Sequence, residues 1–185
     1  MDCETAELAV ERHTTSKLPD GDLTGVETLG FRGEALASVA EVATLEVTTN
    51  DGGPRGTRVV VEGGDRRVSS AGRATGTTVE VRDLFYNRRA RRDSLASPKA
   101  EFARISDVVS GYALVRPAVR FRLRHDDRAV FSTPGSGDYA DALMGVYDRQ
   151  VAARSTELDA EASVDDRTVS VGGVLVYPSV TRSTR

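Results

Sequence analysis

Residues 30–36 read Gly30-Phe31-Arg32-Gly33-Glu34-Ala35-Leu36 and stand directly before a segment with helical periodicity. The two glycines permit backbone conformations and a close approach that other residues cannot adopt. A helix that begins here presents unpaired N–H groups and the positive end of its dipole, and Arg32 adds a multidentate cation. Together these features suit a polyphosphate. The alternative is structural: Gly33 allows tight helix–sheet packing and Arg32 is solvated. Spacing alone favours this alternative, because a single Gly-x-x-Gly is a weak signal.

The surrounding pattern predicts helices and strands in mixed order. Leu36, Val39, Ala40 and Ala43 recur at helical spacing, so a helix is expected from Gly33. A helix over residues 3–13, with Asp2 as its N-cap, and a loop from Pro19 to Gly30 are expected upstream. Downstream, short alternating segments predict an antiparallel meander. Leu45 and Val47 are expected to begin the first strand, and Val59 and Val61 to lie in the second, which ends at Gly63-Gly64. The third and fourth strands are expected at Arg66–Ser69 and Thr77–Leu84.

A long helix and a second α+β unit are expected after this sheet. Residues 98–115 form the clearest helix, and its apolar face is predicted to hold Phe102, Ile105, Val108, Val109 and Tyr112. After Arg116-Pro117, strands are expected at residues 119–124, 129–132, 155–161 and 168–177, with a helix around 139–152. The mixed order favours an α+β fold over a parallel doubly wound sheet. We therefore predict two domains, residues 1–115 and 116–185.

Two further stretches carry polar groups that suit phosphate or nucleic acid. Residues 12–17, RHTTSK, place hydroxyls and a lysine in one loop, although they also fit a helix C-terminus with cations near its last carbonyls. Residues 76–92 read GTTVEVRDLFYNRRARR, and the segment from Arg82 to Arg104 has seven basic and three acidic residues, a net charge of +4. Such a segment can contact nucleic acid, or it can be a solvated loop whose aromatic residues lie in the core.

Composition and the absence of other motifs exclude several classes of protein. The net charge is −3, so overall charge does not argue for nucleic-acid binding. Cys3 is the single cysteine and the two histidines are far apart, which excludes a disulfide framework and argues against a zinc site. The Gly-x-x-x-x-Gly-Lys-Ser/Thr phosphate loop and the Gly-x-Ser-x-Gly nucleophile motif are absent. Without an export signal or an apolar run long enough to span a bilayer, the sequence predicts a cytoplasmic protein without membrane contact.

Three stretches taken together resemble the motifs of the MutL family of DNA mismatch-repair proteins. They are RHTTSKL at 12–18, LGFRGEALASVAEVA at 29–43 and GTTVEVRDLFYNRRARR at 76–92, in this order and spacing. The resemblance covers most of residues 4–115, and residues 116–185 match only in pattern. MutL belongs to the GHKL class of ATPases, and the GFRGEAL and DLFYN runs point to MutL rather than to other members. The chain is therefore identified as similar to the N-terminal MutL region, cut short at both ends.

The resemblance implies a fold and a nucleotide site. The fold is an α+β two-layer sandwich of the GHKL or Bergerat ATPase type, incomplete here, followed by a partial domain like ribosomal protein S5. Carried over by motif, Thr15 and Lys17 lie in the nucleotide lid, and Thr77 hydrogen-bonds the adenine region directly or through water. The residues that wrap the phosphates are Gly30, Phe31, Arg32, Gly33, Glu34, Ala35 and Leu36. Phe85–Arg92 form a structural loop.

The chain departs from the family pattern at several points. Arg88-Arg89 stand where the family usually has Thr-Pro. The catalytic glutamate and the Mg²⁺-binding asparagine are expected on a helix before residue 1, and the adenine-reading aspartate in a motif just upstream. The lysine that reaches the γ-phosphate is expected beyond Arg185. We therefore name no catalytic or metal-binding residue, and we expect residues 1–185 alone to be inactive in ATP hydrolysis.

The implied function is an ATP-dependent switch that couples mismatch recognition to repair. ATP and Mg²⁺ are the implied cofactors, and the implied partners are mismatched DNA, a MutS-type protein and a second copy of the full-length protein. We expect seven arginines to contact the DNA backbone: Arg88, Arg89, Arg91, Arg92, Arg120, Arg122 and Arg124. Two alternatives stay open. One is a non-catalytic DNA-binding or dimerisation module with the same fold, and the other is a different GHKL ATPase such as a type II topoisomerase subunit.

Overall fold

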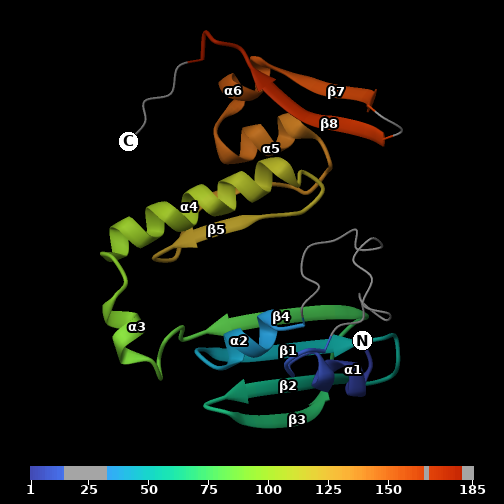
Figure 1. The fold of residues 1–185 in the computed structure, drawn as a ribbon, viewed down its shortest axis with the longest axis vertical. Coiled ribbons are helices and arrows are strands. Elements are labelled where there is room, and N and C mark those ends of the chain that lie inside the picture. Colours follow the sequence, from blue (N-terminus) through green and yellow to red (C-terminus); the bar gives the residue numbers. More distant parts are fainter. Residues whose placement is uncertain (15–32, 165–166, 181–185) are drawn as a thin grey trace. The chain divides into compact units, whose positions relative to one another are not determined.

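The computed structural model describes residues 1–14, 33–164 and 167–180 (Figure 1). Contacts within the chain divide it into two compact units, an N-terminal unit of Met1–Leu95 and a C-terminal unit of Ala96–Arg185. Helices and antiparallel strands occur in both units, so the predicted α+β class is confirmed. Among the described residues, no helix combines the length and the apolar character needed to cross a membrane.

A four-stranded antiparallel sheet forms the base of the N-terminal unit. Its strands are β1 (Thr44–Asn50), β2 (Gly56–Glu62), β3 (Asp65–Ala71) and β4 (Gly76–Arg82), in the order β3-β2-β1-β4. The predicted meander is thus wrong for β4, which pairs with the free edge of β1 instead of β3. The pattern of the strands explains this order. In β4, Val79 and Val81 lie opposite Val47 and Leu45 of β1, whereas β3 is mostly polar and suits an edge.

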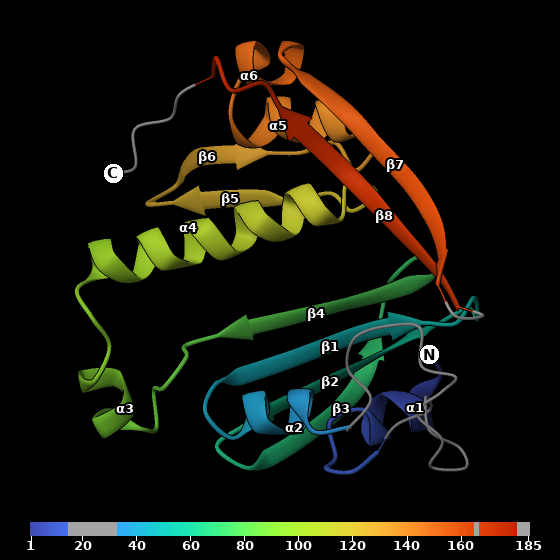
Figure 2. The ribbon, with the colours of Figure 1, turned by 45° about the horizontal axis from the view of Figure 1, so that its top comes forward.

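Two short helices cover one face of this sheet (Figure 2). They are α1 (Cys3–Leu8) and α2 (Ala35–Ala40), and both pack on the central strands. The core between the layers is built from small and branched side chains of both helices and of β1 and β2: Ala6, Val10, Ala40, Leu45, Val47 and Val59, with Leu36, Val39 and Val61 packed against them. The unit is therefore a two-layer sandwich of helices on an antiparallel sheet.

The ends of α1 show why it is shorter than the predicted 3–13 helix. Asp2 is the N-cap, as predicted, and its carboxylate accepts a hydrogen bond from the Thr5 N–H at 2.8 Å. The helix ends at Leu8, and the Thr14 hydroxyl lies 2.5 Å from the Leu8 carbonyl oxygen and 2.8 Å from that of Glu11. The hydroxyl proton can pair with one of these two carbonyls, which a longer helix would have paired internally, and the Leu8 carbonyl also accepts from the Glu11 N–H at 3.0 Å.

The opposite face of the sheet is polar and held by ion pairs. Glu46 of β1 is 9% exposed, and its carboxylate accepts hydrogen bonds from Arg58 Nε at 2.6 Å and Nη2 at 2.7 Å. Arg82 of β4 lies 3.7 Å from the same carboxylate. The hydrogen bond from Arg58 is the main reason why the pKa of Glu46 lies below its ordinary value.

The loop after β4 is tied to the connection between α2 and β1. The Phe85 N–H donates to the Val42 carbonyl at 2.6 Å, and the Asn87 side-chain amide donates to the Glu41 carbonyl at 3.0 Å. The motif that begins at Asp83 thus has a structural role, which agrees with its interpretation as a structural loop. The loop leads into α3 (Arg89–Asp93), a short helix that the sequence pattern did not predict.

The C-terminal unit begins with the long helix α4 (Pro98–Val115), which has the predicted bounds and Ser97 as its N-cap. It packs with the hairpin of β5 (Arg122–His125) and β6 (Arg128–Ser132) around Ala113, Leu123 and Phe131. One apolar face of α4 was predicted, but the structure divides it. Phe102 and Val109 turn to this core, whereas Ile105, Val108 and Tyr112 are exposed on the described surface.

Because α4 packs on β5 and β6, the contacts divide the chain after Leu95, earlier than the predicted boundary at 115/116. That boundary, drawn between two family domains, stays a prediction. The helix expected at 139–152 is two helices, α5 (Tyr139–Val146) and α6 (Arg149–Ala153). They separate because Asp148 caps α6 through the Val151 N–H at 2.9 Å.

The unit continues in a hairpin of β7 (Ser155–Val164) and β8 (Arg167–Val176). The residue pairing puts the acidic side chains of β7 on one face together with Val174 and Val176, and it puts Leu158, Val169, Val171 and Leu175 on the other face.

Candidate functional site

The described residues include one half of the predicted nucleotide site. Thr15, Lys17, Gly30, Phe31 and Arg32 lie outside them. The structure does place the end of the glycine-containing stretch and the threonine of the third motif: Gly33, Glu34, Ala35, Leu36 and Thr77.

Gly33 lies directly against the backbone of Thr14, just before α2. Its φ angle is +63°, and a Cβ added at this position would stand 2.2 Å from the Thr14 carbonyl oxygen. Both facts require glycine: the left-handed conformation disfavours side chains, and the contact with rigid backbone excludes even a methyl group. The backbones of Gly33 and Thr14 are therefore in direct contact. The close backbone approach that the sequence predicted for Gly33 is a contact with Thr14.

The three residues after Gly33 have different surroundings. Glu34 is the N-cap residue of α2 but its side chain makes no capping bond; its carboxylate lies 3.3 Å from His13 Nδ1. Ala35 is exposed, and Leu36 packs against the core of the N-terminal unit. Leu36 thus packs the start of the six-residue helix α2 against the sheet. Gly33 and Glu34 directly precede this helix, and no side-chain capping bond closes its N-terminus.

Thr77 lies on β4 opposite Thr49 of β1. The two hydroxyl oxygens are 2.8 Å apart, and the Thr49 side chain is fully buried whereas Thr77 is exposed. Sequence reasoning missed Thr49. A signal was present, because Thr49 continues the buried alternation of Leu45 and Val47 and is a polar residue at an inward position.

Thr77 and α2 share one side of the sheet. Directly opposed residues point to the same face of an antiparallel pair, so Thr77 faces the helix layer together with Thr49, Val47 and Leu45. On the same face of β4, Val79 and Val81 are 45% and 49% exposed. The helix side of β4 therefore offers a hydroxyl beside an apolar surface, which suits a flat ring with a polar edge.

The arginines predicted to contact DNA are exposed and belong to different units. Arg88, Arg89, Arg91 and Arg92 lie at or in α3 of the N-terminal unit, and within the described ranges none of them forms an ion pair. The other three, Arg120, Arg122 and Arg124, belong to the C-terminal unit, where β5 starts at Arg122 and not at the predicted residue 119.

One of the two arginines on β5, Arg124, is paired with an aspartate. Arg122 and Arg124 are exposed, whereas Leu123 between them enters the core. Arg124 Nη2 donates to the Asp127 carbonyl at 2.9 Å and lies 3.8 Å from its carboxylate. Val119, which was predicted to lie in this strand, is exposed, because the strand has not yet begun there.

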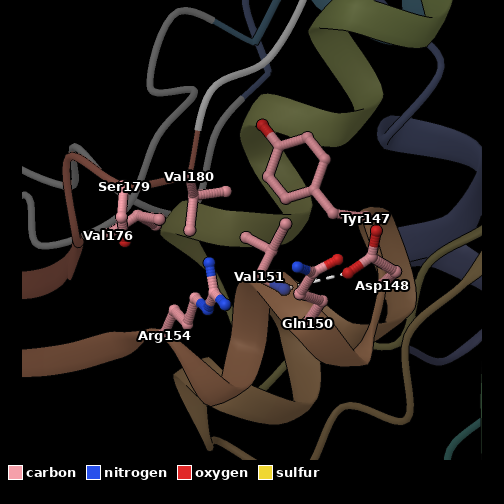
Figure 3. A pocket seen from close by; sticks show the side chains of 8 residues that line it. All are labelled: Tyr147, Asp148, Gln150, Val151, Arg154, Val176, Ser179 and Val180. Atoms are coloured by element: carbon pink, nitrogen blue, oxygen red, sulfur yellow. Dashed lines mark hydrogen bonds between the residues drawn. The ribbon is translucent and has the colours of Figure 1, made fainter.

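A pocket of about 510 Å³ occurs in the C-terminal unit at a place that no motif predicted (Figure 3). Figure 3 shows the Arg154 side chain and the Tyr147 ring on opposite sides of its opening. The Asp148 carboxylate accepts a hydrogen bond from the Val151 N–H. The remaining lining is mixed and consists of Gln150, Val151, Val176, Ser179 and Val180. Among the described residues, no group of three or more His, Cys, Asp or Glu side chains could hold a metal ion.

The chain is similar over nearly its whole length to bacterial and archaeal mismatch-repair proteins. The DNA mismatch repair protein MutL of Halobacterium salinarum is 47% identical over 182 residues, which are 96% of this chain and 28% of the relative. MutL of Geobacillus thermodenitrificans is 41% identical over 188 aligned residues, and MutL of Limosilactobacillus fermentum is 39% identical over 189; each alignment covers 100% of this chain and 28% of the relative. The chain thus spans about 28% of the length of these relatives. No family model matches it.

Solved structures carry the same fold. The crystal structure of the N-terminal domain of a DNA repair protein superposes with a TM-score of 0.69 at 26% identity, covering 94% of this chain and 54% of that one. The ATPase domain of Aquifex aeolicus MutL complexed with ADP superposes with a TM-score of 0.58 at 29% identity, covering 69% of this chain and 52% of that one. The predicted fold type, that of the MutL ATPase domains, is confirmed.

Proposed function

Because the chain belongs to the MutL family over nearly its whole length, we propose that it binds ATP as part of an ATP-driven switch in DNA mismatch repair. The observation that carries this proposal is the 39–47% identity to MutL proteins over nearly the whole chain. The contact of Gly33 with the Thr14 backbone fixes the chain just before α2, and backbone N–H groups at a helix start suit phosphate groups. The solved Aquifex domain, at 29% identity, was complexed with ADP, which supports a nucleotide as the ligand.

We propose separate binding places for the phosphates and for the base of the nucleotide. The phosphates would lie at residues 30–36, with Thr15 and Lys17 closing over them. The base would lie near Thr77, whose exposed hydroxyl stands beside the exposed Val79 and Val81. A planar ring with a polar edge matches that surface, because the valines exclude water from its face and the hydroxyl binds its edge.

Hydrolysis needs more than these residues supply. Attack of water on the γ-phosphate requires a group that orients the water, and metal ions or cations that stabilise the developing charge. Bound Mg²⁺ would supply that charge, but among the described residues no group of three or more His, Cys, Asp or Glu side chains could hold it. Glu34, the carboxylate of the motif, is paired with His13 and is not proposed as the base. We propose that this chain binds nucleotide and does not turn it over alone.

The remaining parts of the proposal rest on family membership. Mismatched DNA, a MutS-type recognition protein and a second copy of the full-length protein are proposed partners, and the cytoplasm is the proposed location. The exposed arginines of α3 and β5 are proposed to contact DNA phosphates, each group within its own unit. Relatives at 39–47% identity are MutL proteins, which favours this family over a topoisomerase subunit.

The test is nucleotide binding by a pair of glycine variants of the full-length protein. Gly33→Ala and Gly63→Ala both put a methyl group at a left-handed φ, +63° and +62°. At Gly63 the nearest atom to the new Cβ is the Tyr86 hydroxyl at 3.4 Å, so this variant carries the conformational cost without a backbone clash. We expect Gly33→Ala, and more severely Gly33→Val, to abolish ATP-analogue binding measured by calorimetry, and Gly63→Ala to bind as wild type does. Unchanged affinity in a folded Gly33→Val protein would remove the phosphate role from this loop.

A further inference from the structure

The pocket of the C-terminal unit lies between α6 and the residues that follow β8 (Figure 3). The Tyr177 N–H donates to the Arg154 carbonyl at 2.9 Å, which ties the end of β8 to the end of α6. The Val180 N–H donates to the Tyr177 carbonyl at 2.9 Å, so the chain turns directly after the strand. These backbone contacts hold the two sides of the pocket together. None of the lining residues belongs to the proposed nucleotide site.

The two charged residues of the lining have opposite signs and stand at opposite ends of α6. Asp148 directly precedes the helix, and Arg154 directly follows it. At a rise of 1.5 Å per residue, their backbones are separated by roughly 9 Å along the helix axis. Figure 3 shows the two side chains at opposite ends of the pocket. A ligand of a single charge that spans the pocket would therefore meet a like charge at one end.

Both charged groups have capacity to bind a ligand. The Arg154 side chain is exposed and forms no hydrogen bond or ion pair with any described residue. The Asp148 carboxylate accepts one hydrogen bond through Oδ1, from the Val151 N–H at 2.9 Å. Because a carboxylate has about four acceptor positions, this bond leaves the second oxygen available.

The lining between the charged ends is largely apolar. It consists of the branched side chains of Val151, Val176 and Val180, with the amide of Gln150 and the hydroxyl of Ser179 beside them. Neither of these two polar side chains has a hydrogen-bond partner within the described part of the chain. The volume of about 510 Å³ lies within the range of small-molecule sites, about 300–1,000 Å³. The lining thus suits an elongated ligand with an apolar middle.

We propose that this pocket binds an extended zwitterion, with its carboxylate at Arg154, its ammonium group at Asp148 and its apolar middle on the valines. One exposed ion pair contributes little, so binding requires both ends and the apolar contact together. Short peptides and ω-amino acids share this chemistry, and the backbone groups of a peptide can also pair with Gln150 and Ser179. The inference is independent of the proposed nucleotide binding.

The test is ligand-observed saturation-transfer NMR on the full-length protein, with titrations of 6-aminohexanoate, hexanoate and hexylamine. The three compounds share a six-carbon chain and differ in their terminal charges. Wild type should bind 6-aminohexanoate roughly two- to fivefold more tightly than either singly charged compound, the contribution of one exposed ion pair. A titration with the tripeptide Gly-Val-Gly distinguishes the two sources. Tighter binding of the tripeptide identifies a peptide as the ligand, and tighter binding of 6-aminohexanoate identifies an ω-amino acid.

Three variants assign the two ends of the pocket. Asp148→Asn removes a charge but keeps the cap on the Val151 N–H, because asparagine caps helices as well as aspartate does. This variant should bind 6-aminohexanoate no better than hexanoate, and Arg154→Gln should bind it no better than hexylamine. Arg149→Gln is the control, because Arg149 lies on α6 but does not line the pocket. Equal binding of the three compounds by wild type, binding of none, or an equal loss in Arg149→Gln and Arg154→Gln would overturn the inference.

Discussion

Replacing Glu46 by glutamine should destabilise the N-terminal unit without changing the residues of the proposed nucleotide site. The Glu46 carboxylate receives two hydrogen bonds from Arg58, at 2.6 and 2.7 Å, and is 9% exposed. It points to the face of the sheet opposite α1 and α2, because it alternates with the buried Leu45 and Val47. Glutamine has the same shape but lacks the charge, and its amide nitrogen would face the guanidinium.

The size of the effect follows from the exposure of the pair. Hydrogen bonds to charged groups contribute about 1.5–3 kcal/mol when buried, and exposed ion pairs about 0.2–1 kcal/mol. The Arg58 side chain is 47% exposed, so water competes on one side of this pair. We expect Glu46→Gln to lower the free energy of unfolding by about 1–2 kcal/mol, which corresponds to a fall in Tm of roughly 5–15 °C for a unit of this size.

The assay is thermal unfolding followed by circular dichroism, with Glu62→Gln as the matched control. Glu62 also pairs with an arginine on a neighbouring strand, Arg67 at 2.9 Å, but both side chains are exposed. The control should therefore lose no more than about 1 kcal/mol. If the two variants were equally destabilised, burial of Glu46 would not be the source of its contribution, and the explanation given for the polar face would be wrong.

The same pair predicts a pH dependence. The pKa of Glu46 lies below its ordinary value of 4.5 in the folded state, chiefly because of the hydrogen bond from Arg58. A lowered pKa means that the unfolded state binds protons first as the pH falls. The contribution of Glu46 is therefore fully present above pH 4.5 and is lost as the pH falls through the folded-state pKa. The gap in stability between wild type and Glu46→Gln should close over that range.

Two further predictions concern DNA and catalysis. Changing Arg120, Arg122 and Arg124 together to glutamate should weaken DNA binding at low salt and reduce its salt dependence, because contacts with phosphate release counterions. Arg104→Glu, at a residue paired with Glu101, serves as the control, and a triple variant that binds as wild type does would show that these arginines are only solvated. Residues 1–185 alone should release phosphate from ATP at the background rate, because no residue of this chain is assigned as the general base or as a metal ligand. Turnover above background in a phosphate-release assay would show that the catalytic residues have been misplaced.

Local chemistry made much of the fold predictable. The Asp2 cap, the start and end of α4 and the apolar face of α2 each depend on residues close in sequence, and all were found as predicted. The predictions were wrong where contacts between residues far apart in the sequence determine the structure. In α4 two apolar stripes alternate, and periodicity does not tell which stripe meets the β5–β6 hairpin. At Tyr147–Asp148 a local cap interrupted a helical pattern that periodicity alone had continued.

The order of the sheet is the clearest case in which an error of sequence reasoning matters for the site. A meander would put β4 beside β3, and two strands would then separate Thr77 from β1. Instead β4 pairs with β1, so Thr77 stands opposite the buried Thr49 and on the face that α2 covers. The motif resemblance predicts a nucleotide as the ligand, and the pairing of β4 with β1 places Thr77 on the side of the sheet that carries α2.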